Sequence, residues 1–262
     1  MPYSIKGVLR HPLRVGVRLV WLACEMVWTA ASFVFLYSFR SGVPELEARA
    51  RWLQVGCRRA LRVFNLQIQS YGPIPTHGLL VSNHLSYLDV LILSALTPSI
   101  FVAKQDVKHW PVFGWFARLG GTLFADRSRR AQVMPLTREL RNVLDQGALV
   151  ALFPEGTSSG GRTVLPFKSA LLESVANSFH PLAACRIDYS LEDGDTAEEV
   201  CYWKDMTFLP HLLNLLSKER VDASVRFSEV HASSSDRKHL ALQLRCEVSK
   251  LTFVDSGFFA GV

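Results

Sequence analysis

Short apolar runs alternate with stretches of helical periodicity from about residue 65 onward, and this alternation limits the possible folds more than any other feature. Apolar runs of roughly four to eight residues bounded by Gly or Pro are typical of buried strands. The expected strands span residues 66–71, 79–82, 100–103, 122–125, 149–153, 182–187 and 224–230. The expected helices span residues 87–95, 112–119, 130–146, 168–179, 209–216 and 236–251. The pattern predicts an α/β fold with a mixed, mostly parallel central sheet flanked by helices.

A histidine follows the expected strand at residues 79–82, at the edge of the sheet where ligands of such folds bind. Asn83 and His84 come directly after the strand, and Asp89 lies near the start of the next helix, which Ser86 is expected to open. A neutral histidine accepts a proton from a hydroxyl group, and a carboxylate orients the ring and stabilises the imidazolium. We therefore interpret His84 as a general base that activates a substrate hydroxyl, and Asp89 as its partner. The alternative is that Asp89 only caps the helix and His84 is an ordinary turn residue.

Two further loops follow expected strands of the same sheet. Arg127 offers a planar guanidinium suited to phosphate or carboxylate groups, and the alternative is a surface pair with Asp126. The second loop contains Glu155 and Gly156, and backbone amides of such a loop can face an anion or a developing oxyanion. Glu155 is expected either to receive a hydroxyl group of the acceptor or to order the arginine. Taken singly, each loop is also compatible with an ordinary surface turn.

The N-terminal part contains an apolar stretch at residues 19–39 with one charged residue, Glu25, and it is long enough to cross a membrane. It lacks the small-residue cleavage site of a signal peptide. Basic residues spaced four apart precede it and form one helical stripe that suits anionic headgroups: Lys6, Arg10, Arg14 and Arg18. Basic residues also follow the stretch, so charge does not select an orientation. We interpret the stretch as a membrane anchor that spans, re-enters or lies at the interface; the alternative is a buried core helix.

Residues 44–66 show the spacing of an amphipathic helix, either packed on the catalytic domain or lying on the bilayer. The chain carries 29 Lys and Arg against 23 Asp and Glu, and 49% of its residues are hydrophobic. A basic, apolar chain of this kind favours a membrane surface over nucleic acid as partner. Its five cysteines are scattered without a C-x-x-C pair, which argues against zinc and disulfides and fits a reducing compartment.

Three ordered motifs resemble those of the PlsC-type glycerolipid acyltransferases, a family that includes the 1-acylglycerol-3-phosphate acyltransferases. The first, N-H-x-x-x-x-D, stands at residues 83–89, and the second, G-x-x-F-x-D-R, stands at residues 121–127. The third, F-P-E-G-T-R-S, stands at residues 153–159 with serine at position 158. The resemblance covers roughly residues 65–190.

The resemblance implies transfer of a fatty acyl group from acyl-CoA or acyl-carrier protein to a lysolipid hydroxyl, with His84 as the base and Asp89 as its orienter. The residues expected to bind substrate are Lys104, Arg127, Glu155, Gly156, Thr157, Ser158 and Lys168. No metal, no bound cofactor and no nucleic acid is expected. The expected organisation has membrane-associated helices at residues 1–64 and an acyltransferase domain at residues 65–262, with the catalytic domain on the cytoplasmic face of a membrane.

Ser158 departs from the arginine that the 1-acylglycerol-3-phosphate enzymes usually carry in the third motif. Losing one arginine of a phosphate clamp weakens binding of a phosphate monoester, because charge-assisted hydrogen bonds are the strong ones. The expected acceptor is still 1-acylglycerol-3-phosphate. Lyso-ornithine lipid or another lysolipid is the alternative, and the other classes considered are a thioesterase and a lipid-binding protein without activity.

Overall fold

A sheet of seven strands forms the centre of the described part of the chain. The computed structural model describes residues 10–39, 45–110, 112–125, 133–176, 178–231 and 236–252. The strands are β1 (Leu66–Tyr71), β2 (Gly78–Ser82), β3 (Ile100–Lys104), β4 (Leu123–Ala125), β5 (Leu149–Leu152), β6 (Leu182–Ser190) and β7 (Val221–Val230). Their order across the sheet is β1-β7-β6-β2-β5-β3-β4. Each expected strand is present within a few residues of its predicted bounds.

All neighbouring strands run parallel except β6 and β7, which pair in antiparallel fashion. The mixed, mostly parallel sheet predicted from the sequence is therefore confirmed. Because β2, β5 and β3 are parallel neighbours, their carboxyl ends meet at one edge of the sheet. This edge receives the turn after β2 and the loop after β5, which carry the first and third sequence motifs.

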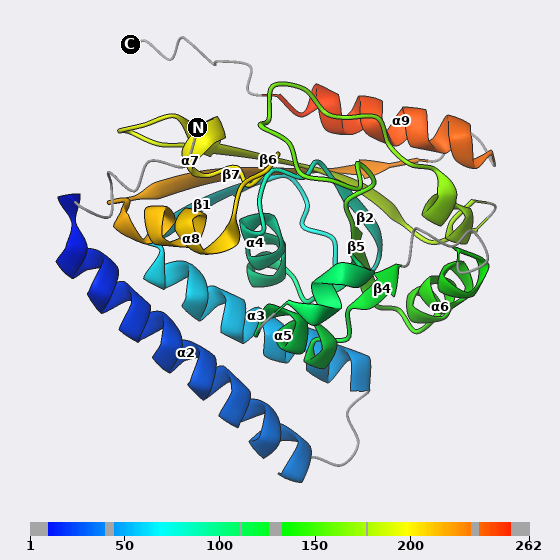
Figure 1. Cartoon of the computed structure of the whole chain (residues 1–262). Helices are drawn as coiled ribbons and strands as arrows, with labels where there is room; N and C mark the ends of the chain where they lie inside the picture. The colour runs from blue at the N-terminus through cyan, green and yellow to red at the C-terminus, as the bar shows by residue number, and fades with distance from the viewer. Residues whose placement is uncertain are drawn as a thin grey trace, which may run out of the picture.

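Helices cover both faces of the sheet (Figure 1). Their bounds are α2 (Pro12–Phe39), α3 (Glu45–Val63), α4 (Leu88–Leu96), α5 (Phe113–Leu119), α6 (Val133–Asp145), α7 (Thr196–Glu199), α8 (Phe208–Ser217) and α9 (Arg237–Lys250), with 3-10 turns η1 (Gln105–His109) and η3 (Ala170–Ser174). Strand β2 shows how the layers form. Leu80 packs into the core shared with α3, α4 and α8, whereas Leu79 and Val81 pack into the core shared with α6 and α9. Burial on both faces explains the continuous apolar run of this strand.

The helix predicted at residues 168–179 is wrong, because among the described residues of this stretch only the short 3-10 turn η3 forms. The Ser174 hydroxyl donates to the carbonyl of Leu171, and the Ser178 hydroxyl donates to the carbonyl of Val175. Serine hydroxyls that bond to nearby carbonyls offer the backbone an alternative to a longer helix. The acidic stretch at residues 191–199 contains α7, which Asp195 caps through the amides of residues 197 and 198.

Helix α2 is long and apolar enough to cross a membrane by length and composition. It lies outermost in the molecule, with α3 between it and α4 (Figure 1). Its large exposed apolar side chains are Leu13, Val17, Val20, Trp21, Val27, Trp28, Val34 and Phe35. Of the two placements left open for the amphipathic helix, the structure shows the packed one, because α3 packs against α4.

Polar contacts join α2 to the rest of the chain. The buried Trp52 of α3 donates from Nε1 to the Thr29 carbonyl at 3.0 Å, and Arg59 pairs with Glu25 at 2.5 Å. Arg14 and Arg18 donate to backbone carbonyls at the end of α8, so these two members of the basic stripe bond within the protein rather than facing headgroups. Lys6 lies outside the described residues.

Candidate active site

The turn after β2 holds His84 at the carboxyl edge of the sheet. The buried side chain of Asn83 bonds to both the N–H and the carbonyl of Ile187 on β6, each at 2.8 Å. This amide thereby replaces the ladder contacts that β2 would make if it continued. The chain is free to turn away from the sheet at the next residue and to carry the imidazole to its edge.

Asp89 lies directly behind the imidazole, as the sequence predicted. His84 Nδ1 is 2.8 Å from Asp89 Oδ2, and the Asp89 side chain is fully buried. The same oxygen accepts the backbone N–H groups of Leu85 at 2.6 Å and Ser86 at 2.9 Å. A neutral imidazole that donates from Nδ1 carries its lone pair on Nε2, which is the form a general base needs.

Ser86 does not cap the following helix, which corrects one detail of the prediction. Helix α4 begins at Leu88, after Tyr87, and no side chain caps it through a hydrogen bond. The Asp89 carboxylate instead reaches back to the amides of Leu85 and Ser86. Asp89 therefore stabilises the turn before α4 and also holds His84, and the alternative that it only caps the helix is wrong.

The loop after β5 packs against His84 from the other side. The Phe153 ring stacks on the imidazole with centroids 4.3 Å apart. Glu155 is 3% exposed, and its Oε1 accepts the backbone N–H of His84 at 3.2 Å. Burial raises the pKa of Glu155 to about 7, against the smaller lowering effect of the N–H groups of His84 and Leu165. This carboxyl group therefore stabilises the His84 turn by accepting its backbone N–H.

A third segment, at residues 201–204, joins the two loops. The Ser158 hydroxyl donates to the carbonyl of Tyr202, and the Tyr202 N–H donates to the carbonyl of Leu85 at 2.8 Å. The Ser159 N–H donates to the carbonyl of His84 at 2.9 Å. The hydroxyl at the position of the missing arginine thus stabilises the loop.

The structure places the other described substrate-binding candidates at the ends of β3 and β5 or beside the loop after β5. Thr157 is exposed, and Gly156 has φ of 74°, a left-handed conformation that turns the loop. Lys104 ends β3 and pairs with Asp106, and the exposed Lys168 is held beside the loop by its N–H, which donates to the Pro154 carbonyl at 2.9 Å. Arg127 lies outside the described residues, as does Asp126.

The sequence did not single out Tyr189 of β6. Its hydroxyl donates to Asp89 Oδ1 at 2.6 Å, from a position one hundred residues further along the chain. No local spacing connects the two, so only the parallel pairing of β2 with β6 brings them together. Across the part of the chain that the structure describes, no cluster of three or more His, Cys, Asp and Glu side chains suits a metal ion.

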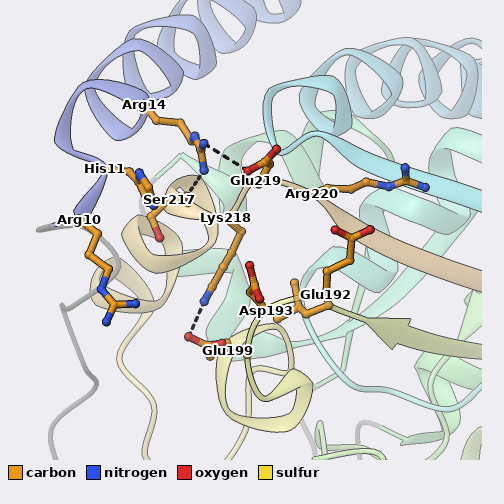
Figure 2. Close-up of a pocket in the computed structure, with 12 residues that line it drawn as sticks. Arg10, His11, Arg14, Glu192, Asp193, Glu199, Ser217, Lys218, Glu219 and Arg220 are labelled. Carbon is orange, nitrogen blue, oxygen red and sulfur yellow. Dashed lines mark hydrogen bonds and ion pairs between the residues drawn. The ribbon is translucent and has the colours of Figure 1, made fainter.

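A separate cavity of about 620 Å³ lies between the start of α2, the end of α8 and the loop after β6 (Figure 2). Its charged groups largely neutralise one another, since Lys218 pairs with Glu199 and Arg14 pairs with Glu219 at 3.7 Å. None of the described site residues predicted from the sequence lines this cavity. The motif residues therefore gather at a different place on the same protein.

Comparison with known proteins agrees with the motifs. Residues 65–188 match the family model described as Acyltransferase. The lyso-ornithine lipid O-acyltransferase of Brucella abortus is 36% identical over 211 residues, which cover 74% of this chain and 79% of that protein. The chain belongs to the acyltransferase family. The resemblance inferred from the three motifs is confirmed.

Further members of the acyltransferase family are similar over most of the chain. The 1-acyl-sn-glycerol-3-phosphate acyltransferase of Neisseria meningitidis is 32% identical over 226 residues, covering 85% of this chain and 88% of that protein. The crystal structure of the 1-acyl-sn-glycerophosphate acyltransferase PlsC from Thermotoga maritima superimposes with a TM-score of 0.63 at 18% identity, covering 94% of this chain and 97% of the other. The latter likeness confirms the fold.

Proposed function

We propose that this protein transfers a fatty acyl group from a thioester to a hydroxyl group of a lysolipid. The observation that carries the proposal is the His84–Asp89 pair, with Nδ1 and Oδ2 2.8 Å apart at the carboxyl edge of the sheet. The relatives from Brucella abortus and Neisseria meningitidis are named as acyltransferases of lysolipids, which supports this substrate class. The expected donors are acyl-CoA and acyl-carrier protein.

In the proposed mechanism, His84 Nε2 accepts the proton of the acceptor hydroxyl while that oxygen attacks the thioester carbonyl carbon. A C–O bond forms, and the carbonyl electron pair moves onto oxygen to give a tetrahedral intermediate. The intermediate collapses with cleavage of the C–S bond, and the imidazolium returns its proton to the departing thiolate. Asp89 stabilises the imidazolium between the two proton transfers. The mechanism uses no metal ion and no bound cofactor.

Glu155 supports the mechanism by fixing the backbone position of His84. Its carboxyl group is buried and accepts the His84 N–H. We therefore assign Glu155 a positioning role in addition to the contact with the acceptor expected from the family. Gly156, Thr157 and Arg127 are proposed to hold the polar head of the acceptor, with Lys104 and Lys168 at the margin of the same edge.

Two acceptors are consistent with this site. The first is 1-acylglycerol-3-phosphate, which the family motifs favour. The second is lyso-ornithine lipid, which Ser158 favours because a serine at this position supplies no guanidinium for a phosphate monoester. The Ser158 hydroxyl instead donates to the Tyr202 carbonyl. A headgroup that carries a carboxylate and an amine requires less positive charge than a phosphate monoester does.

The test uses purified protein in detergent with a labelled acyl thioester and the two lysolipids offered in parallel. Acylated product, identified by mass, that requires both the acceptor and the enzyme supports lysolipid acylation. Thioester hydrolysis with neither acceptor acylated would contradict it and indicate a thioesterase. Ser158→Arg, compared with Ser158→Ala, is expected to raise activity on 1-acylglycerol-3-phosphate relative to lyso-ornithine lipid by several fold.

The lysolipid acceptor agrees with membrane association of the N-terminal part. The apolar outer surface of α2 provides a face for acyl chains, while α3 keeps the helix next to the catalytic domain. We propose that residues 1–64 hold the enzyme at the membrane and that residues 65–262, on the cytoplasmic face, reach the acceptor from there. Labelling of single cysteines in membrane vesicles from outside and inside tests this orientation.

A further inference from the structure

A half-buried tyrosine from β6, Tyr189, contacts the oxygen of Asp89 that the histidine does not use. Oδ2 of the carboxylate accepts from His84 Nδ1 and from the N–H groups of Leu85 and Ser86. Oδ1 accepts from the Tyr189 hydroxyl at 2.6 Å, within the range of a strong O–H···O⁻ bond. Burial, and then the charge of Asp89, raise the pKa of Tyr189 well above its usual value, so the hydroxyl keeps its proton and donates.

We propose that Tyr189 is a positioning residue that sets the proton affinity of the His84 imidazole through Asp89. The proposal rests on the proposed function, in which His84 is the base. A hydrogen bond donated to Oδ1 draws negative charge away from Oδ2 and fixes the plane of the carboxylate. Both effects reach the imidazole through the 2.8 Å bond between Oδ2 and Nδ1.

Asp89 accepts four hydrogen bonds, and the one from Tyr189 differs from the other three. Those three come from within the turn itself, at residues 84–86, and all of them use Oδ2. Tyr189 is the donor to Oδ1 among the described residues, and it comes from a strand that is held independently by its pairing with β2 and β7. Tyr189 therefore ties the orientation of the carboxylate to the sheet.

Loss of the Tyr189 hydroxyl is expected to move the activity of the base to higher pH. Without it, the fully buried carboxylate concentrates its negative charge on Oδ2, which stabilises the imidazolium more strongly. If the carboxylate instead takes up a proton, that protonation also occurs at higher pH than before, because a hydrogen bond to the charged form has been lost. In both cases the base becomes active at higher pH, so the acidic limb of the profile of kcat/KM against pH moves upward.

Other titratable groups lie close to Asp89 or Tyr189. Glu155 from the loop after β5, Cys185 on β6 and Cys201 after α7 interact with Asp89, Tyr87 before α4 interacts with Tyr189, and Asp188 on β6 interacts with the two cysteines. The Glu155 carboxyl titrates near the pH range of the assay, since burial raises its pKa to about 7. The Tyr189 effect is therefore measured both in the wild type and in a Glu155→Gln background.

The experiment compares Tyr189→Phe with the matched control Tyr87→Phe. Tyr87 is a neighbouring half-buried tyrosine whose hydroxyl bonds to His211 Nδ1 at 3.1 Å and does not contact Asp89. The acidic limb is expected to move upward by about half a pH unit or more in Tyr189→Phe, on the scale of one lost charge-assisted hydrogen bond. The limb is expected to stay in place in Tyr87→Phe. A limb that does not move in Tyr189→Phe, whatever happens to kcat, would overturn the proposal.

A second measurement keeps the test independent of activity and of folding defects. Titration of the His84 imidazole by NMR, assigned with His84→Ala, reports its proton affinity directly, and it is expected to rise in Tyr189→Phe but not in an Asp89→Asn background. Site-specific 3-fluorotyrosine at position 189 keeps the shape and donates more strongly, so it is expected to lower the proton affinity. If the titration shifts as stated but the wild type shows no acyl transfer, the proposed function fails and the link from Tyr189 to His84 stands. If transfer occurs and neither change moves the titration, the link fails.

Discussion

Replacing Glu155 by glutamine tests whether the carboxyl group beneath His84 is held in a site that disfavours its charge. The side chain is 3% exposed and accepts the His84 N–H. Burial raises its pKa from 4.5 to about 7. Glutamine keeps an oxygen that can accept the same N–H and has nearly the same volume, but it has no charge to bury.

The expected magnitude follows from linkage between protonation and folding. Between pH 4.5 and pH 7 the folded protein retains a proton on Glu155 that the unfolded chain has released, so stability falls as pH rises. The full contribution is present below pH 4.5 and is lost once the pH has passed about 7. At about 1.4 kcal/mol for each pH unit, the loss amounts to about 3 kcal/mol. For a chain of this size, that corresponds to roughly 6–12 °C in melting temperature.

The assay is unfolding in detergent at several pH values from 4.5 to 8, with wild type and Glu155→Gln measured side by side. The free energy of unfolding of the variant relative to wild type is expected to rise by about 3 kcal/mol across this range. Glu192→Gln, at an exposed acid, serves as the control and is expected to show a constant difference. A difference for Glu155→Gln that is also constant with pH would refute the argument that burial controls the protonation of this group.

Two further predictions concern packing around the site. Trp52→Phe keeps a ring between α2 and α5 but loses the Nε1 bond to the Thr29 carbonyl. The variant is expected to lower the free energy of unfolding by about 1–3 kcal/mol, measured by thermal unfolding. An unchanged melting temperature would contradict this. In Gly160→Ala the new Cβ would lie 2.6 Å from the Trp203 ring, so displacement of the third-motif loop is expected to lower transfer several fold and stability by about 1–3 kcal/mol. Gly16→Ala, with nothing within 4 Å of the new Cβ, is the matched control, and equal losses in both variants would exclude the steric explanation.

The central strands β2 and β5 were predictable because burial on both faces produces continuous apolar runs. Strands β1 and β7 are exceptions: β1 buries only Leu66, and β7 alternates between buried and half-buried positions along most of its length. Asp222 interrupts the apolar pattern near the start of β7, which was predicted only from residue 224. Local competition by serine hydroxyls explains the wrong helix at residues 168–179. Sequence periodicity reflects only the spacing of apolar residues. A serine hydroxyl that bonds to a nearby carbonyl alters the backbone conformation without altering that spacing, so periodicity does not detect it.

The candidate site was predictable where its residues lie close together in the chain. His84 and Asp89 are five residues apart, and one turn brings them together. The contacts of Asn83 with Ile187 and of Asp89 with Tyr189 cross about a hundred residues, so they depend on the order of strands in the sheet. The same reason explains why the contact between the Glu155 carboxyl group and the His84 N–H, which also spans many residues, was not predicted.

The central claim is that His84 activates a lysolipid hydroxyl for attack on an acyl thioester. Its most direct test is acceptor-dependent consumption of a labelled thioester by wild type and His84→Ala, with circular dichroism as the check that both are folded. Folded His84→Ala is expected to lose on the order of 10²–10⁴-fold in rate, the usual contribution of a general base. Transfer at the wild-type rate by the folded variant would contradict the assignment of His84 as the base.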